Sequence, residues 1–158
     1  IAGATLVGQH LGAGNPDQAK RAGWGAMRLS IISMTFFGIL IAVFAQPLAR
    51  FMIDNDEVVR LSVIFIWLLG SMQPLMAIEF SLGGALRGAG DTKTPLAITL
   101  TCLLFIRVFL AVIFFLLDAS IEIIFSTLVA DYVVKGFLYV SRFRSDKWMN
   151  ALQSKEAS

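Results

Sequence analysis

Hydrophobic residues occur along this chain in long blocks that are separated by short polar connections. A helix needs about 20 predominantly apolar residues to cross the hydrocarbon core of a bilayer, whereas a barrel strand needs only about 10 alternating residues. The block lengths therefore predict transmembrane helices. The first block is the shortest, and residues 23–26 could extend it toward the N-terminus. The predicted spans are residues 28–45, 61–86, 96–117 and 121–140.

An additional apolar segment, residues 1–11, opens the chain. It starts at Ile1 without a basic region before it, which is not the pattern of a secretory signal peptide. We expect these residues to be the end of a helix that begins earlier, and residues 1–158 to be a fragment of a larger membrane protein. The expected fold class is all-α, a polytopic transmembrane helix bundle.

The composition agrees with a membrane protein and excludes several other classes. Hydrophobic residues make up 57% of the chain and charged residues 15%, against about 25% charged residues in ordinary soluble domains. The net charge of +2 is too small to indicate nucleic-acid binding. Cys102 is the one cysteine and His10 the one histidine, so neither a disulfide nor a paired metal site is expected. No cofactor is predicted.

The positions of lysine and arginine predict which ends of the helices are cytoplasmic, because cytoplasmic loops are enriched in these residues. The second connection has two basic residues, Arg50 and Arg60, against three acidic ones, Asp54, Asp56 and Glu57. The fourth connection, residues 118–122, has no basic residue, so both connections are predicted to face outward. The first connection, the third connection and the tail, residues 141–158, are predicted to be cytoplasmic. Their basic residues are Lys20, Arg21, Arg28, Arg87, Lys93, Arg142, Arg144, Lys147 and Lys155.

Two glycine-rich stretches resemble each other, GQHLGAGNP at residues 8–16 and GALRGAGDT at residues 84–92. Glycine lets a chain leave a helix in the left-handed conformation, and it also lets neighbouring backbones approach closely. Both stretches are therefore predicted at helix ends. Neither has the lysine and hydroxyl residues of a phosphate-binding Walker motif, which argues against nucleotide binding.

These stretches also carry a resemblance to a known family. Residues 5–17, followed by Ala19, resemble the end of the eighth helix of multidrug and toxic compound extrusion (MATE) transporters. Gln73 and Pro74, then residues 84–92 and Pro95, resemble the tenth helix and the loop after it. The basic tail segment RFRSDKW at residues 142–148 resembles the cytoplasmic end of many members.

The resemblance implies a protein of twelve helices in two lobes, of which this chain would hold part of the C-terminal lobe, from the end of helix eight through helix twelve. Its partners would be the N-terminal lobe, membrane lipid and small organic substrates, with no nucleic acid. MATE transporters exchange Na⁺ or H⁺ for amphipathic, often cationic, compounds, so we expect an antiporter rather than an enzyme. The expected location is the plasma membrane of a prokaryote, with the C-terminus in the cytoplasm.

Four ionisable residues lie inside the predicted spans: Glu79, Arg107, Asp131 and Lys135. Charges at such depths are costly and usually face the interior of a bundle or a cavity. One interpretation is a buried network that fixes helix packing, with Arg107 beside Asp131 and Lys135 beside Glu79. The other is a cation site. A carboxylate that holds a proton, a Na⁺ ion or an organic cation, one at a time, couples their movements.

Gln73 and Met76 lie on the same predicted span as Glu79 and complete the predicted cation and substrate site. That site consists of Glu79, Asp131, Gln73 and Met76, with Arg107 and Lys135 as supporting charges. The resemblance implies an acidic cation-binding residue at the position of Met76. Glu79 lies three residues further on and nearly on the same helix face, so it is a substitute candidate. The alternative is that the coupling acids lie in the other lobe. Gln73 could bind substrate or the backbone that Pro74 interrupts.

A second transport function is possible, because the wider superfamily contains flippases for lipid-linked oligosaccharides. A flippase predicts a strongly cationic cavity for its phosphate groups. Both deep cations, Arg107 and Lys135, have an acidic residue available as a partner. This favours export of cationic compounds over a flippase.

Overall fold

The computed structural model describes residues 2–52, 54–117 and 121–149, and the side chains of residues 121–126 lie outside this description. Within these ranges all regular structure is helical, which confirms the predicted all-α transmembrane bundle. The fourth connection, residues 118–122, lies largely outside the described residues, as does the tail beyond residue 149. The helices are α1 (Ala2–Gly12), α2 (Pro16–Val43), α3 (Ala45–Met52), α4 (Asp56–Gly88), α5 (Lys93–Thr101), η1 (Cys102–Val108), α6 (Phe109–Leu116) and α7 (Ile121–Arg144).

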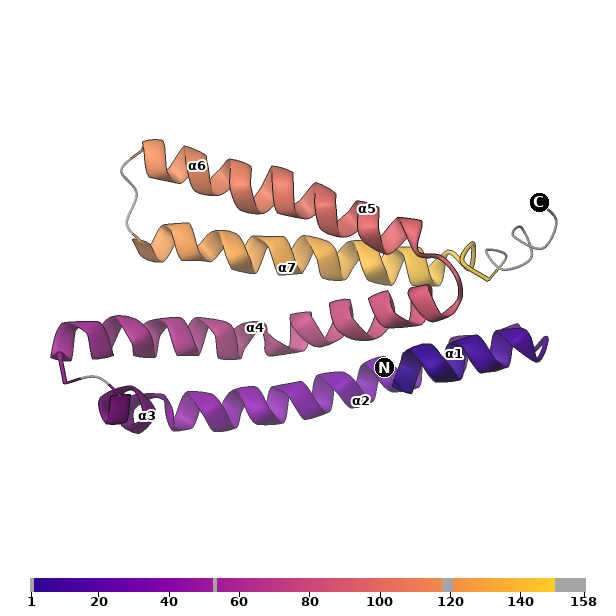
Figure 1. The fold of residues 1–158 in the computed structure, drawn as a ribbon, viewed down its shortest axis with the longest axis horizontal. Helices are drawn as coiled ribbons and strands as arrows, with labels where there is room; N and C mark the ends of the chain where they lie inside the picture. Colours follow the sequence, from indigo (N-terminus) through magenta and orange to yellow (C-terminus); the bar gives the residue numbers. More distant parts are fainter. Residues whose placement is uncertain (1, 53, 118–120, 150–158) are drawn as a thin grey trace.

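The long helices form an antiparallel bundle (Figure 1). Helices α2, α4, the continuous α5–η1–α6 helix and α7 alternate in direction, so the α1–α2 turn, the α4–α5 loop and the end of α7 lie together at one end. We call this the basic end, because Arg87 and Arg142 lie in the last turns of α4 and α7, and Lys20 and Arg21 in the first turns of α2. The alternation matches the distribution of charge along the sequence.

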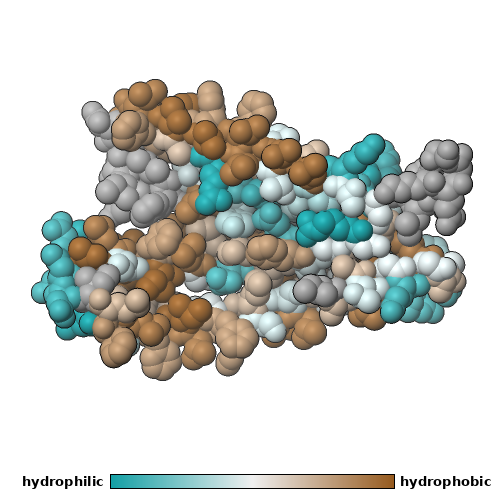
Figure 2. All heavy atoms as spheres, in the orientation of Figure 1, coloured by the Kyte–Doolittle hydropathy of each residue, from teal (hydrophilic) through white to brown (hydrophobic). Residues whose placement is uncertain are grey.

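Three of these helices are long and apolar enough to cross a membrane: Pro16–Val43, Asp56–Gly88 and Lys93–Leu116. Helix α7 has 24 residues and runs beside them, but its interior carries Asp131 and Lys135. Figure 2 shows hydrophobic residues over much of the α5–η1–α6 helix and the lower left of the molecule, with hydrophilic residues at the two ends and some in the middle of this face. Phe36 on α2 and Phe115 on α6 are 63% and 71% exposed, which suits contact with lipid rather than water.

Helix boundaries differ from the apolar blocks, because capping residues extend the helices into polar sequence. Helix α2 begins at Pro16, which is favourable at the first helical position, where its missing N–H costs nothing. Helix α4 begins at Asp56, because the side chain of Asn55 accepts hydrogen bonds from the N–H groups of Glu57 (3.0 Å) and Val58 (3.3 Å).

Two local features were not predicted. A short amphipathic helix, α3, follows α2 directly and lies across the bundle in Figure 1. In the third predicted span, η1 is a π-helix of seven residues, although the sequence there contains no glycine or proline.

The two glycine-rich stretches fold in the same way. The N–H of Gly14 donates to the carbonyl of Leu11 and that of Asn15 to the carbonyl of His10, and the equivalent bonds join Gly90 to Arg87 and Asp91 to Leu86. This is the Schellman arrangement, in which a left-handed residue ends the helix. Gly14 and Gly90 have φ values of 73° and 83°. The similarity between the stretches is therefore a similarity of helix endings.

Glycine also sets the distance between α1 and α4. A Cβ atom on Gly8 would lie 2.8 Å from the carbonyl oxygen of Gly88, and a Cβ on Gly88 would collide with the carbonyl oxygen of Ala4. The helices thus pack backbone against backbone, as small residues permit in membranes. Gly12 holds the position in the first stretch that Gly88 holds in the second, but nothing lies near its missing Cβ.

The best-packed region lies at the basic end. Its buried members include Leu82, Leu86 and Phe143 from α4 and α7, together with Trp148 from the segment after α7. The Trp148 ring stacks on Phe143 with centroids 4.6 Å apart, and its Nε1–H donates to the Phe143 carbonyl at 2.9 Å. The start of the tail is therefore packed against the bundle.

One ion pair at the basic end joins the α4–α5 loop to α7. Asp91 accepts hydrogen bonds from Nη2 and Nε of Arg142 at 2.7 and 3.1 Å, and from the N–H of Thr94 at 3.2 Å. Burial alone would raise the pKa of Asp91, but its hydrogen bonds from Arg142 and Thr94 outweigh burial and hold the pKa below its usual value.

Glycine packing gives the first prediction. Gly88→Ala should destabilise the full-length protein by about 1–3 kcal/mol, because the new methyl group meets a backbone carbonyl that cannot rotate away. The matched control is Gly12→Ala, which has open space and should leave stability unchanged or slightly raised. Thermal unfolding in detergent micelles measures both. Equal effects of the two substitutions would show that the α1–α4 approach is not tight.

The Asp91 pair gives the second prediction. Asp91→Asn should reduce stability by about 1–3 kcal/mol at pH 7, because a charged hydrogen-bond acceptor is lost from Arg142. Since the folded-state pKa of Asp91 lies below the ordinary aspartate value of 3.8, this contribution is fully present above pH 3.8 and disappears as the pH falls through the lowered pKa. Unfolding of both proteins between pH 7 and pH 3 checks this. A difference that persists unchanged at low pH would contradict it.

Candidate functional site

The structure brings three of the four predicted intramembrane charges together. Glu79 lies on α4, and Asp131 and Lys135 lie one turn apart on α7. Nζ of Lys135 donates to Oδ2 of Asp131 at 2.8 Å and lies 3.9 Å from Oε1 of Glu79. We call these three residues the buried charge cluster. Lys135 is its centre, because it contacts both carboxylates.

Burial and unused oxygen atoms distinguish this cluster from a surface salt bridge. The side chains of Asp131 and Lys135 are 0% and 5% exposed, and that of Glu79 is 15% exposed. Among the described residues, Oδ1 of Asp131 and Oε2 of Glu79 are buried and accept no hydrogen bond. A buried polar atom without a partner is costly, so these oxygens are available to a bound cation or proton.

Aromatic and hydroxyl groups line α7 on either side of Lys135. Its Nζ lies 5.3 Å from the centroid of the Tyr132 ring, within the range of a cation–π contact. One turn further, the hydroxyl of Tyr139 donates to the Pro95 carbonyl at 3.2 Å and lies 3.1 Å from Oγ1 of Thr99. Lys135 and Tyr139 of α7 therefore point toward α4 and α5.

Arg107 lies apart from this cluster. It is exposed, within the π-helix η1, and forms no ion pair with any described carboxylate. The pairing of Arg107 with Asp131 is therefore wrong. Lys135 replaces it because a lysine four residues after an aspartate lies on the same helix face, directly within reach.

Gln73 and Met76 lie on α4 and are both partly buried. Gln73 packs where α2 and α4 cross, because a Cβ on Gly38 would lie 2.8 Å from its Cγ and 3.0 Å from the Gly70 carbonyl oxygen. Pro74 has no N–H with which to bond that carbonyl, yet α4 continues through it. Roles for Gln73 and Met76 in binding substrate stay predictions.

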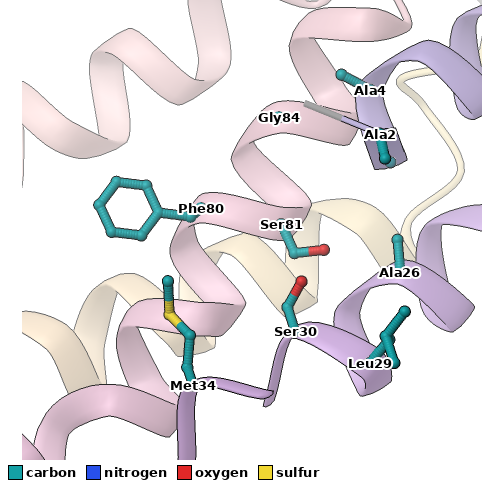
Figure 3. Close-up of a pocket in the computed structure, with 10 residues that line it drawn as sticks. Ala2, Ala4, Ala26, Leu29, Ser30, Met34, Phe80, Ser81 and Gly84 are labelled. Carbon is teal, nitrogen blue, oxygen red and sulfur yellow. The ribbon is translucent and has the colours of Figure 1, made fainter. Parts of the chain in front are cut away.

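A separate pocket of about 290 Å³ lies on the other side of α4, between α1, α2 and α4. Figure 3 shows the hydroxyl groups of Ser30 and Ser81 near each other in this pocket, while the ring of Phe80 points away from them. Ser81 is two residues after Glu79, and successive helical residues are rotated by about 100°, so the pocket and the buried charge cluster lie on opposite faces of α4.

The buried charge cluster has the chemistry of a site for one cation. When all three groups are ionised, one ammonium faces two carboxylates, and one negative charge is uncompensated. A monovalent cation or a proton would neutralise it without displacing Lys135. Among the described residues no group of three His, Cys, Asp or Glu side chains could hold a metal ion.

Comparisons with known proteins identify the family. The family model described as MatE matches residues 1–113. The chain is 32% identical over 157 residues to the probable multidrug resistance protein NorM of Thermotoga maritima, which covers 94% of this chain. It is 30% identical to the Pasteurella multocida protein of the same name over 65% of the chain, and 31% identical to multidrug and toxin extrusion protein 1 of Xenopus tropicalis over 59%.

These matches cover only part of each relative, since the chain spans 32% of the length of the Thermotoga maritima protein and 22% of that from Pasteurella multocida. No solved structure gives a significant match. The family match covers most of the sequence, includes both glycine-rich stretches and extends through α4. The chain therefore belongs to the MatE family, and it is an integral membrane protein.

Proposed function

We propose that the protein to which this chain belongs is a secondary active antiporter, which exports amphipathic or cationic organic compounds in exchange for Na⁺ or H⁺. The names of its relatives, multidrug resistance and multidrug and toxin extrusion proteins, support export of drugs. The observation that carries the coupling step is the buried charge cluster of Glu79, Asp131 and Lys135, with its two unpartnered carboxylate oxygens.

In this mechanism Lys135 acts as a resident cation. Its short contact with Asp131 offsets the cost of burying that carboxylate, while its longer contact leaves Glu79 more weakly paired. Glu79 is therefore the carboxylate that exchanges its ligand. While a proton or Na⁺ is bound to the Glu79 carboxylate, a cationic substrate cannot bind there. This competition converts a gradient of one cation into export of another.

The alternative, a flippase for lipid-linked oligosaccharides, receives less support. Its phosphate groups would need a cationic cavity inside the bundle. The one deeply buried cation described here, Lys135, is already held by two carboxylates, and Arg107 lies on the exposed surface. The charge of the described interior suits a cationic ligand.

The proposed orientation places the basic end in the cytoplasm of a prokaryotic cell, with the chain in the plasma membrane. Lysine and arginine of three separate connections gather at that end in the folded bundle, and the positive-inside rule assigns such an end to the cytoplasm. The C-terminus would then also be cytoplasmic. In the proposed arrangement this chain is part of the C-terminal lobe, and its partner is an N-terminal lobe of the same protein.

The coupling role is tested by Glu79→Gln in the full-length transporter. We expect dye efflux driven by a Na⁺ or pH gradient to fall at least about tenfold, because the amide cannot hold an exchangeable cation. Glu57→Gln is the matched control, because it makes the same substitution at an exposed position in the first turn of the same helix. Unchanged efflux in Glu79→Gln would remove this residue from the mechanism, and separate gradients identify the coupling ion.

The role of Lys135 is tested by a double-mutant cycle with Asp131. Lys135→Met should destabilise the protein by about 3–5 kcal/mol, because Asp131 is left buried without its partner. The double variant Asp131→Asn with Lys135→Met no longer strands a charge at Asp131 and, like the wild type, keeps one uncompensated carboxylate in the cluster, so it should recover most of that stability. Thermal unfolding in detergent measures all four proteins. If Lys135→Met alone were as stable as the wild type, the cluster would not be a tightly coupled ion pair.

A further inference from the structure

A groove at the basic end, between α2 and α7, has no part in the proposed transport mechanism. Its volume is about 620 Å³. Its lining combines three basic side chains with aromatic and apolar ones. The residues are Lys20, Trp24, Met27, Arg28, Val140 and Arg144.

Helical spacing brings these residues to a single groove. Lys20, Trp24 and Arg28 follow one another at intervals of four residues along α2, so they lie on one face of that helix. Val140 and Arg144 have the same spacing on α7. The two faces are turned toward each other, and each contributes both apolar surface and a basic group.

Two of the three cations are uncompensated. Nζ of Lys20 donates to Oδ2 of Asp146 at 2.7 Å, an ion pair that closes one edge of the groove. Arg28 and Arg144 are exposed and form no ion pair with a described carboxylate. Two guanidinium groups are therefore free to bind an anion, and their planar donors match the oxygens of a phosphate group.

The wall of the groove is rigid. The Trp24 ring packs edge-on against Phe143 with centroids 5.5 Å apart, and Phe143 is stacked on the buried Trp148. Gly23 permits this contact, because a Cβ there would collide with the Phe143 ring. Tryptophan in such a position is typical of the membrane–water interface, where headgroups and acyl chains meet.

The mixed lining identifies the ligand. A soluble phosphate would use the guanidinium groups but gain nothing from Met27 and Val140, whereas a phospholipid uses both parts of the groove. Basic pockets between transmembrane helices at the cytoplasmic surface are suited to anionic headgroups. We propose that this groove binds an anionic phospholipid, with its phosphate on Arg28 and Arg144 and the start of an acyl chain against Met27 and Val140.

The test uses the full-length protein in detergent micelles, titrated with phosphatidylglycerol or with zwitterionic phosphatidylcholine. Bound lipid is counted by native mass spectrometry. The double variant R28Q/R144Q should weaken binding of phosphatidylglycerol by roughly 30-fold, because each of the two basic residues is expected to contribute about fivefold (about 1 kcal/mol) at the surface. Binding of phosphatidylcholine should change little.

A matched control lies at the opposite end of the bundle. A groove of about 540 Å³ is lined there by Arg50, Arg60 and Trp67, but also by the carboxylate of Asp56. R50Q/R60Q should therefore leave the affinity for phosphatidylglycerol unchanged. An equal loss in both double variants, or no loss in R28Q/R144Q, would overturn the proposal.

A third titration separates a lipid from a soluble anion. Glycerol phosphate carries the same anionic group without acyl chains, and it should compete only weakly with phosphatidylglycerol. Competition at equal concentration would show that the groove is a general anion site, which overturns the assignment to lipid. Gel filtration and thermal unfolding verify that each variant is folded before its affinities are compared.

Discussion

The cost of holding charge inside a helix bundle constrains this structure more than any other interaction. Asp131 and Lys135 are almost fully buried in a chain whose outer surface is apolar, so neither could remain ionised there alone. Asp131 and Lys135 pair at 2.8 Å within α7, and Nζ of Lys135 also lies 3.9 Å from Oε1 of Glu79, a contact that joins α7 to α4. The same contact leaves one negative charge for a mobile cation, so packing and proposed transport depend on one arrangement.

The features that sequence analysis could predict are those that depend on local chemistry or on the bilayer. Long apolar blocks imply helices, because every backbone polar group in lipid must be bonded within its own segment. The glycine-rich stretches could be placed at helix ends because glycine alone tolerates the left-handed conformation of Gly14 and Gly90 without strain. Glu79 and Lys135 could be proposed as neighbours from their depth. These predictions required no knowledge of how helices turn relative to each other.

The features that could not be predicted depend on rotation and on long-range contact. Depth alone allows Arg107 to pair with Asp131, but Arg107 is exposed within η1, and nothing in the sequence of η1 indicates a π-helix. Trp148 belongs to a segment that the sequence predicts to be a basic tail, whereas its side chain is buried in the core. The pair of Asp91 and Arg142 was also missed. Its only signal was an acidic residue at the end of a glycine-rich stretch, opposite a basic helix end.

Helix α7 shows how a bundle can be held together where burial of apolar surface gives no net driving force between helices. Its inward face carries polar groups at successive turns, and each meets a different element. Lys135 contacts Glu79 of α4, Tyr139 binds the Pro95 carbonyl of α5, and Arg142 binds Asp91 in the loop between them. Polar contacts thus position α7 along much of its length. In the proposed mechanism a cation that exchanges at Glu79 would change the contact between Glu79 and Lys135, so it would link ligand binding to the position of α7.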